Sequence, residues 1–164
     1  AHGAKGRVEP VPTDGDYSIF IDYAVTPDAI ENVLTTLRGI APKRLVMLFG
    51  AGGDRDRKKR PIMGKISADI ADFVIVTSDN PRTEDPMSII EEILPGVRAG
   101  KAPYKVICDR PEAIRWAIDH HEPGDVILLC GKGHEDYQII GHEKIHMDER
   151  EIVADYLAER AKRN

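Results

Sequence analysis

Short apolar runs alternate along the chain with longer segments in which apolar residues recur every three or four positions. Continuous apolar runs of roughly four to eight residues are typical of buried parallel strands, and the wider spacing is typical of amphipathic helices. Strands are predicted at 18–22, 44–49, 73–77, 105–108 and 125–130, and helices at 27–39, 61–72, 86–94 and 111–121. This alternation predicts an α/β fold with a Rossmann-like, mostly parallel sheet and helices on both faces.

The pattern changes after the last of these strands. Residues 137–140 and 143–146 flank Gly141-His142, which is typical of a two-residue hairpin turn, so we expect the sheet to end in an antiparallel pair. A final helix is predicted over 149–160, with Asp148 as its capping residue. Other helices are expected to begin at a capping residue that stands just before a proline: Thr26, Asp85 and Asp109.

Residues 1–16 differ from the rest, because glycines and prolines are frequent there and apolar periodicity is weak. We interpret this segment as a linker or leading arm that continues from a preceding region of a longer protein. The folded domain is then expected over 17–164, and 164 residues are enough for one domain with its own core.

Composition narrows the possible partners. The net charge of −5 disfavours a nucleic-acid module, since the chain has no overall excess of cations for phosphates. The apolar stretches are far shorter than the roughly 20 residues that cross a bilayer, and no leader pattern opens the chain, so no membrane partner is expected. Cys108 and Cys130 lie in apolar, strand-like contexts, which predicts reduced, buried thiols in a cytoplasmic protein. No histidine or cysteine spacing is typical of a metal site, and none is expected.

Two polar clusters follow predicted strands directly. Asp79-Asn80-Pro81-Arg82 comes after 73–77, and Gly131-Lys132-Gly133-His134-Glu135 comes after 125–130. Because the carboxyl ends of parallel strands meet at one edge of a sheet, both clusters should border one crevice. The Arg82 guanidinium suits a carboxylate and Glu135 suits an ammonium group. Together they favour a small zwitterionic ligand.

Less specific interpretations of these clusters stay open. Pro81 biases Asn80 toward an extended backbone, but Asp79 and Asn80 could equally form Asx turns while Arg82 points into water. His134 beside Glu135 could act as a general base, yet a charged ligand needs no proton transfer to be held. We therefore favour binding over catalysis and assign no catalytic residue.

The segment after the strand at 44–49 is rich in glycine and basic residues. Gly50, Gly52 and Gly53 would let the backbone approach a ligand, but they complete neither a dinucleotide fingerprint nor a P-loop. The chain thus lacks a conventional phosphate cradle for ATP. Arg55 fits a ligand contact and a solvated charge equally well, whereas the charges at 57–60 are more typical of a solvated face.

Four segments in this order resemble one family: FIDYAVTPD at 20–28, GGDRD at 52–56, DNPR at 79–82 and GKGHEDYQ at 131–138. They resemble the C-terminal domain of the UDP-N-acetylmuramoyl-tripeptide synthetases, the Mur ligases that add the third peptide residue in peptidoglycan synthesis. The resemblance extends from about Gly6 to the last helix. In this family, Asp-Asn-Pro-Arg is the signature of ligases that add meso-diaminopimelate, and lysine-adding relatives carry a different segment there.

The resemblance implies roles for individual positions. Arg55, Asn80 and Arg82 would bind carboxylates of the incoming amino acid, and Gly131 and Glu135 would hold its distal amino-acid centre. The remaining positions that the resemblance marks are Asp79 and Pro81 in the same motif, Asp22 and Tyr23 on a segment that faces ATP, and Arg7 on the strand that enters the domain.

The resemblance also implies ATP and Mg²⁺ as cofactors of a full-length, amide-forming ligase. ATP and the UDP-linked acceptor would be held mainly by a central ATPase domain and a UDP-binding domain outside this chain. The chain alone should then be inactive and bind no cofactor tightly. Val25 stands where the family usually has histidine, so that nucleotide-side contact would be absent or replaced, and Ala51 stands where cysteine is common.

Two other classes of function remain open from the residues alone. A free-standing α/β module for a metabolite or nucleotide would call for a complete glycine fingerprint and an acidic ribose partner, which the sequence lacks. A non-catalytic interaction domain would leave the polar clusters at the strand ends without a role.

Overall fold

The computed structural model describes residues 8–163. Its strands are β1 (Glu9–Val11), β2 (Tyr17–Asp22), β3 (Arg44–Phe49), β4 (Phe73–Val76), β5 (Tyr104–Val106), β6 (Asp125–Cys130), β7 (Tyr137–Ile140) and β8 (Glu143–His146). Its helices are α1 (Pro27–Arg38), α2 (Lys59–Ile70), α3 (Pro86–Ala99), α4 (Arg110–Asp119) and α5 (Glu149–Arg163).

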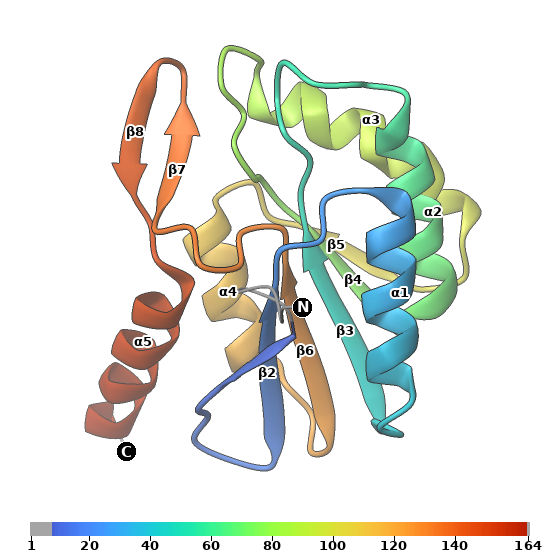
Figure 1. The fold of residues 1–164 in the computed structure, drawn as a ribbon. Helices are drawn as coiled ribbons and strands as arrows, with labels where there is room; N and C mark the ends of the chain where they lie inside the picture. Colours follow the sequence, from blue (N-terminus) through green and yellow to red (C-terminus); the bar gives the residue numbers. More distant parts are fainter. Residues whose placement is uncertain (1–7, 164) are drawn as a thin grey trace, which may run out of the picture.

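Six strands form the main sheet in the order β1-β2-β6-β3-β4-β5, and all neighbours are parallel except β1 and β2. One core lies between this sheet and α1, α2 and α3, and a second lies between the sheet and α4 and α5. Figure 1 shows these two groups of helices on opposite sides of the strands. The expected α/β architecture is confirmed.

Burial on both faces explains the continuous apolar runs. Along β3, Met47 and Phe49 pack into the first core, whereas Val46 and Leu48 pack into the second. Successive side chains of a strand point to opposite faces, so a central parallel strand needs apolar residues at every position.

Two features of the strands differ from the expectations. Glu9–Val11 forms β1, an antiparallel edge strand, within the segment whose apolar pattern suggested only a linker. Proline is tolerated on an edge strand, and a strand this short leaves too few positions for a visible alternation. The expectation that the hairpin would close the main sheet was wrong, because β7 and β8 form a separate two-stranded sheet (Figure 1).

Helix α3 continues to Ala99, past the expected end at Leu94, although Pro95 lies inside it. Packing against α2 outweighs the lost hydrogen bond at the proline. A Cβ on Gly96 would lie 1.7 Å from the carbonyl oxygen of Pro61, which shows how closely the two helices approach. Ile93 and Val97 are buried in the same interface.

The expected helix caps are confirmed. The side chains of Thr26, Asp85 and Asp109 accept hydrogen bonds from backbone N–H groups at 3.2, 3.1 and 3.0 Å. Asp148 caps α5 through the amide of Arg150 at 2.9 Å. Thus local capping chemistry sets these helix starts.

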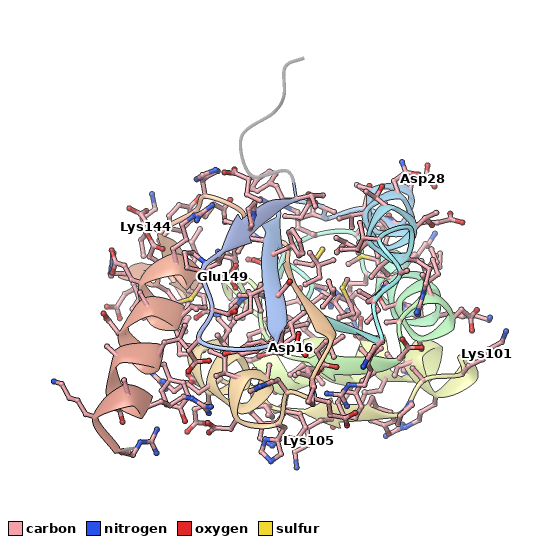
Figure 2. All side chains as sticks on the ribbon, turned by 90° about the horizontal axis from the view of Figure 1, so that it is seen from below. Asp16, Asp28, Lys101, Lys105, Lys144 and Glu149 are labelled. Atoms are coloured by element: carbon pink, nitrogen blue, oxygen red, sulfur yellow. The ribbon has the colours of Figure 1, made fainter. Side chains whose placement is uncertain are left out.

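Most charged side chains lie on the surface, but a few are buried. Figure 2 shows Asp28, Lys101 and Lys105 at the periphery, where they are exposed, whereas Glu149 lies inside and is 1% exposed. Cys130 is buried as expected, and Cys108 is half-buried. Within residues 8–163, no helix has the length and apolar character needed to cross a membrane.

Candidate functional site

Loops at the carboxyl edge of the main sheet border a cavity of about 420 Å³. The loops follow β2, β3, β4 and β6, as expected for an open α/β sheet. The cavity brings together six of the residues expected at the site: Arg55, Asp79, Asn80, Arg82, Gly131 and Glu135. Arg82 and Glu135, which the zwitterion hypothesis requires to be neighbours, therefore face one space.

The backbone of Arg82 has an unusual conformation that the hairpin holds in place. Its φ angle of 52° lies in the left-handed region, which is uncommon for a residue with a side chain. The Arg82 amide donates to the carbonyl oxygen of Ile139 at 3.0 Å, and the Gly141 amide donates to the carbonyl oxygen of Arg82 at 2.6 Å. The β7–β8 hairpin thus supports the loop that carries Asn80 and Arg82.

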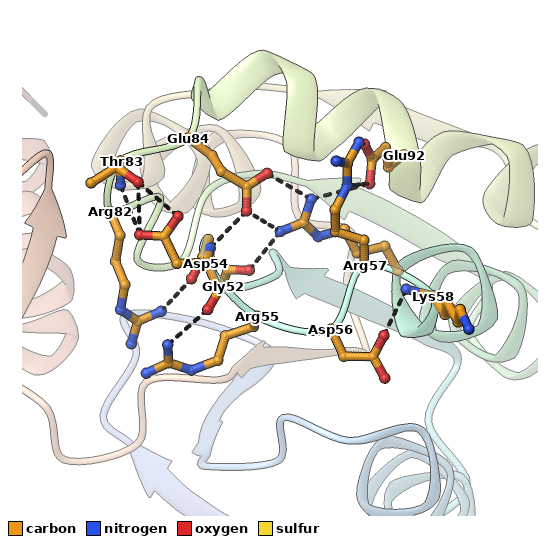
Figure 3. Close-up of polar contacts among 12 residues, drawn as sticks. Gly52, Asp54, Arg55, Asp56, Arg57, Lys58, Arg82, Thr83, Glu84 and Glu92 are labelled. Atoms are coloured by element: carbon orange, nitrogen blue, oxygen red, sulfur yellow. Dashed lines mark hydrogen bonds and ion pairs between the residues drawn. The ribbon is translucent and has the colours of Figure 1, made fainter.

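Two guanidinium groups at the cavity lack anionic partners. Arg82 Nη1 donates to the carbonyl oxygen of Gly53 at 2.9 Å, and Arg55 Nη1 donates to that of Asp54 at 3.0 Å. Within residues 8–163, neither arginine forms an ion pair. Figure 3 shows the two side chains on the same side of the glycine-rich loop that follows β3 (residues 50–53). Both side chains approach Gly52 closely. The cavity therefore presents two positive groups with donors free for a carboxylate.

The loops after β3 and β4 are joined by backbone and side-chain contacts (Figure 3). The Gly53 amide donates to the carbonyl oxygen of Asn80 at 2.7 Å, and Thr83 donates to the Asp54 carboxylate at 2.7 Å. A Cβ on Gly53 would lie 1.8 Å from the carbonyl oxygen of Pro81, so only glycine fits there. Pro81 accordingly contributes to the shape of the site and does not line the cavity.

Arg60 was expected on a solvated face, and this was wrong. Its side chain is 1% exposed and pairs with Glu84 at 2.7 Å and Glu92 at 3.1 Å. It also donates to the carbonyl oxygen of Gly52 at 2.9 Å. The Arg60 hydrogen bond lowers the pKa of Glu84 to about 2. Arg60 thus helps to fix the loop that carries Gly52. A run of charged residues in a sequence does not reveal which member the fold will bury.

Lys132 is a second cation that sequence reasoning did not assign. Its side chain is fully buried, and its Nζ lies 2.7 Å from Asn80 Oδ1 and 2.9 Å from Glu135 Oε1. The other oxygen of Glu135 accepts from Tyr23 Oη at 2.9 Å, a bond that raises the pKa of the tyrosine. Glu135 therefore lines the cavity with a cation and a hydroxyl group already bound to its carboxylate. The only feature of the sequence that could have indicated a role for Lys132 was its position directly after Gly131, in a cluster of polar residues.

Arg110 was also missed. Its fully buried guanidinium donates to the carbonyl oxygens of Ser78 and Cys130, both at 2.9 Å, and to Glu149 at 2.8 Å. These two carbonyls come directly before Asp79 and Gly131. Arg110 thus ties together the two strand ends from which the site loops emerge.

The residues expected on the ATP side have other contacts in this structure. The Asp22 carboxylate accepts from the amides of Val8 at 2.6 Å and Ala24 at 2.8 Å, and Tyr23 lines the cavity. Arg7 lies outside the described residues. His134 pairs with Glu9 and does not line the cavity.

Comparisons with known proteins decide the family. Residues 6–133 match the family model described as Mur ligase, glutamate ligase domain. The chain belongs to this family.

This Mur ligase domain is similar to curated UDP-N-acetylmuramoyl-L-alanyl-D-glutamate--2,6-diaminopimelate ligases. It is 54% identical to that of Caldanaerobacter subterraneus subsp. tengcongensis, covering 96% of this chain and 33% of the relative. It is 55% identical to that of Trichormus variabilis, covering 98% of this chain and 32% of the relative. The chain thus spans about a third of the length of these relatives.

Solved structures agree with this assignment. A structure of a UDP-N-acetylmuramoyl-L-alanyl-D-glutamate--2,6-diaminopimelate ligase matches with a TM-score of 0.88 and 40% identity, over 98% of this chain and 33% of that one. A murein peptide ligase from Psychrobacter arcticus matches with a TM-score of 0.64 at 19% identity, over 93% of this chain and 30% of that one. The second match shows the common fold alone.

Proposed function

We propose that this Mur ligase domain binds meso-diaminopimelate and holds it for ATP-dependent addition to UDP-N-acetylmuramoyl-L-alanyl-D-glutamate in peptidoglycan synthesis. The names of the similar ligases support the reaction, and the cavity supports the amino acid. On this proposal, the domain acts within a longer cytoplasmic ligase. It contributes binding and positioning rather than acid–base chemistry.

The observation that carries the proposal is the pair of unpaired guanidinium groups, Arg55 and Arg82, in one cavity with the carboxylate of Glu135. Diaminopimelate has a carboxylate and an ammonium group at each end, so it can satisfy both arginines and present an ammonium group to Glu135. Glu135 retains lone pairs for that contact although Lys132 and Tyr23 already donate to it.

The same arrangement would discriminate against lysine. Lysine lacks one of the two carboxylates, so its binding would leave a guanidinium in the cavity without a partner. An unsatisfied charged group costs more than a missing methylene group, which makes this a strong basis for selection.

The described residues do not fit ATP phosphates or Mg²⁺ as a complete site. The chain lacks a P-loop, and residues 8–163 contain no group of three or more His, Cys, Asp or Glu side chains arranged to hold a metal. We therefore place ATP, Mg²⁺ and the UDP-linked acceptor mainly on other domains of the ligase. Contacts of Arg7, Asp22 and Tyr23 with ATP belong to that same proposal.

The test uses a full-length ligase that carries this domain and compares kcat/KM for meso-diaminopimelate and L-lysine. We expect the wild-type enzyme to prefer meso-diaminopimelate strongly. Arg82→Ala should lower kcat/KM for meso-diaminopimelate by roughly 10- to 100-fold, because a charge-assisted hydrogen bond contributes about 1.5–3 kcal/mol. Lysine turnover should change little. Equal use of both amino acids by the wild-type enzyme would contradict the proposal.

A further inference from the structure

Lys132 is buried and contacts two of the residues that line the cavity, Asn80 and Glu135. We propose that Lys132 is a positioning residue that locks the Asn80 amide with its nitrogen toward the cavity, so that this end of the site accepts a carboxylate and rejects an ammonium group. The inference rests on the proposed function and concerns how its selectivity arises.

The orientation of the Asn80 amide follows from its two neighbours. Asn80 Oδ1 lies 2.7 Å from Lys132 Nζ and 2.9 Å from the backbone nitrogen of Ile139. An ammonium group and a peptide N–H are both donors only. A flipped amide would direct its NH₂ group at two donors, so both would lose the acceptor that Oδ1 provides and the NH₂ group would face them without a partner. The geometry therefore permits one orientation.

The locked orientation gives Asn80 a defined chemical character toward a ligand. Asn80 lines the cavity with 5% of its surface exposed, and no described residue accepts a hydrogen bond from its Nδ2. Because Oδ1 is occupied on the buried side, the group left for a ligand is a pair of N–H donors. Such a group bonds to a carboxylate oxygen and has nothing to offer an ammonium group.

Lys132 holds the two site loops with one buried charge. Its Nζ lies 2.9 Å from Glu135 on the loop after β6, and 3.6 Å from Asp79 on the loop after β4. Among the described residues, no other cation forms an ion pair with either carboxylate. The lysine therefore links the orientation of Asn80 to the position of Glu135, the two ends that a bound zwitterion would contact.

The first test is Lys132→Met in a full-length ligase that carries this domain, with Lys144→Met as the matched control. Lys144 also lies over the Tyr137 ring, at 4.2 Å against 4.9 Å for Lys132, but its side chain is exposed on β8. We expect Lys132→Met to lower kcat/KM for meso-diaminopimelate by at least about tenfold, mainly through KM, while kcat/KM for L-lysine stays within about threefold. Lys144→Met should change neither. An equal fall for both amino acids would mean a merely structural role and would overturn the inference.

A second variant decides the question if Lys132→Met does not fold. Asn80→Asp keeps an acceptor for Lys132 and Ile139 but replaces the donor toward the cavity with a carboxylate oxygen. We expect normal thermal unfolding and loss of most of the preference for meso-diaminopimelate over L-lysine. Retained preference in this variant would overturn the inference. If the wild-type enzyme prefers meso-diaminopimelate and Arg82→Ala weakens that preference, the proposed function stands whatever Asn80→Asp shows.

Discussion

The backbone amide of Gly141 donates a hydrogen bond to the carbonyl oxygen of Arg82 at 2.6 Å. This bond joins the turn of the β7–β8 hairpin to the loop that carries the carboxylate-binding candidates Asn80 and Arg82. Arg82 has a left-handed backbone conformation, with φ at 52°, which needs support from its surroundings. The separate hairpin is therefore part of the site's framework, although none of its residues lines the cavity.

Breaking this bond should weaken ligand binding. Gly141→Pro removes the amide donor and cannot adopt the φ of 63° found at this position. We expect kcat/KM for meso-diaminopimelate in a full-length ligase to fall by roughly five- to tenfold, in line with about 1 kcal/mol for one hydrogen bond. Gly141→Asn is the control, because asparagine keeps the amide, tolerates a positive φ and has open space for its Cβ. If both variants match the wild type, the hairpin does not support the site.

The buried pair of Arg110 and Glu149 should dominate the stability of this edge of the sheet. Both side chains are fully buried and 2.8 Å apart. Arg110→Met leaves the Glu149 carboxylate without its cation, so we expect the free energy of unfolding to fall by about 3–5 kcal/mol, measured by urea denaturation. Arg115→Met on the exposed side of the same helix should change it by less than about 0.5 kcal/mol.

The double variant Arg110→Met, Glu149→Leu separates the ion pair from simple loss of packing. It removes both charges, so it should be more stable than Arg110→Met alone. A double variant less stable than the single one would show that Glu149 stabilises the protein through something other than its pairing with Arg110.

Gly53→Ala should distort the site directly. The new Cβ would lie 1.8 Å from the carbonyl oxygen of Pro81, and a backbone atom can only move if the loop moves with it. We expect a loss of about 1–3 kcal/mol in the free energy of unfolding and a marked rise in KM for meso-diaminopimelate. Gly15→Ala is the matched control, because its nearest contact would be an ordinary 3.5 Å. Wild-type KM in Gly53→Ala would contradict the close approach of the two loops.

Acid should weaken the contact between Arg60 and Glu84. The hydrogen bond from Arg60 lowers the pKa of Glu84 from 4.5 to about 2. A depressed pKa in the folded state contributes stability that is fully present above about pH 4.5 and is lost as the pH falls toward 2. Chemical denaturation between pH 7 and 2 should show Glu84→Gln about 1–2 kcal/mol less stable than the wild type at neutral pH, allowing for the partial exposure of Glu84.

The difference between the two proteins should shrink as the pH falls below about 4.5. Glu91→Gln serves as the control, since Glu91 is exposed on the same helix as Glu92 and forms no ion pair with any described residue. A difference that stays constant across this range would show that Glu84 stabilises the loop through something other than its charge.

Much of the fold could be predicted because the type of a residue and its close neighbours in the chain often indicate whether it is buried or caps a helix. The run in β6 is apolar at almost every position since both faces of that strand are covered, and Asp109 precedes its helix because its side chain binds the amide of Glu112. The candidate site followed from the same logic, as Asn80 and Glu135 come directly after buried parallel strands. Their meeting at one cavity needed only the rule that such strand ends share an edge.

Features that depend on several segments at once could not be predicted. Helix α3 passes through Pro95 because α2 packs closely against it at Gly96, a contact between residues far apart in the chain. Arg60 and Lys132 look like ordinary members of polar segments, yet the fold buries both and surrounds them with carboxylates from other loops.

Residues close together in the chain were enough to predict the alternation of strands and helices, the helix caps and the edge of the sheet that carries the polar clusters. The same residues also indicated the kind of charge that those clusters offer. Which cations stay free for a ligand, and which ones hold the framework together, became clear only from the folded structure. Arg55 and Arg82 remain without anionic partners, while Lys132 and Arg110 do not. That division depends on which carboxylates and carbonyls the folded loops bring within hydrogen-bonding distance, and local sequence does not contain those distances.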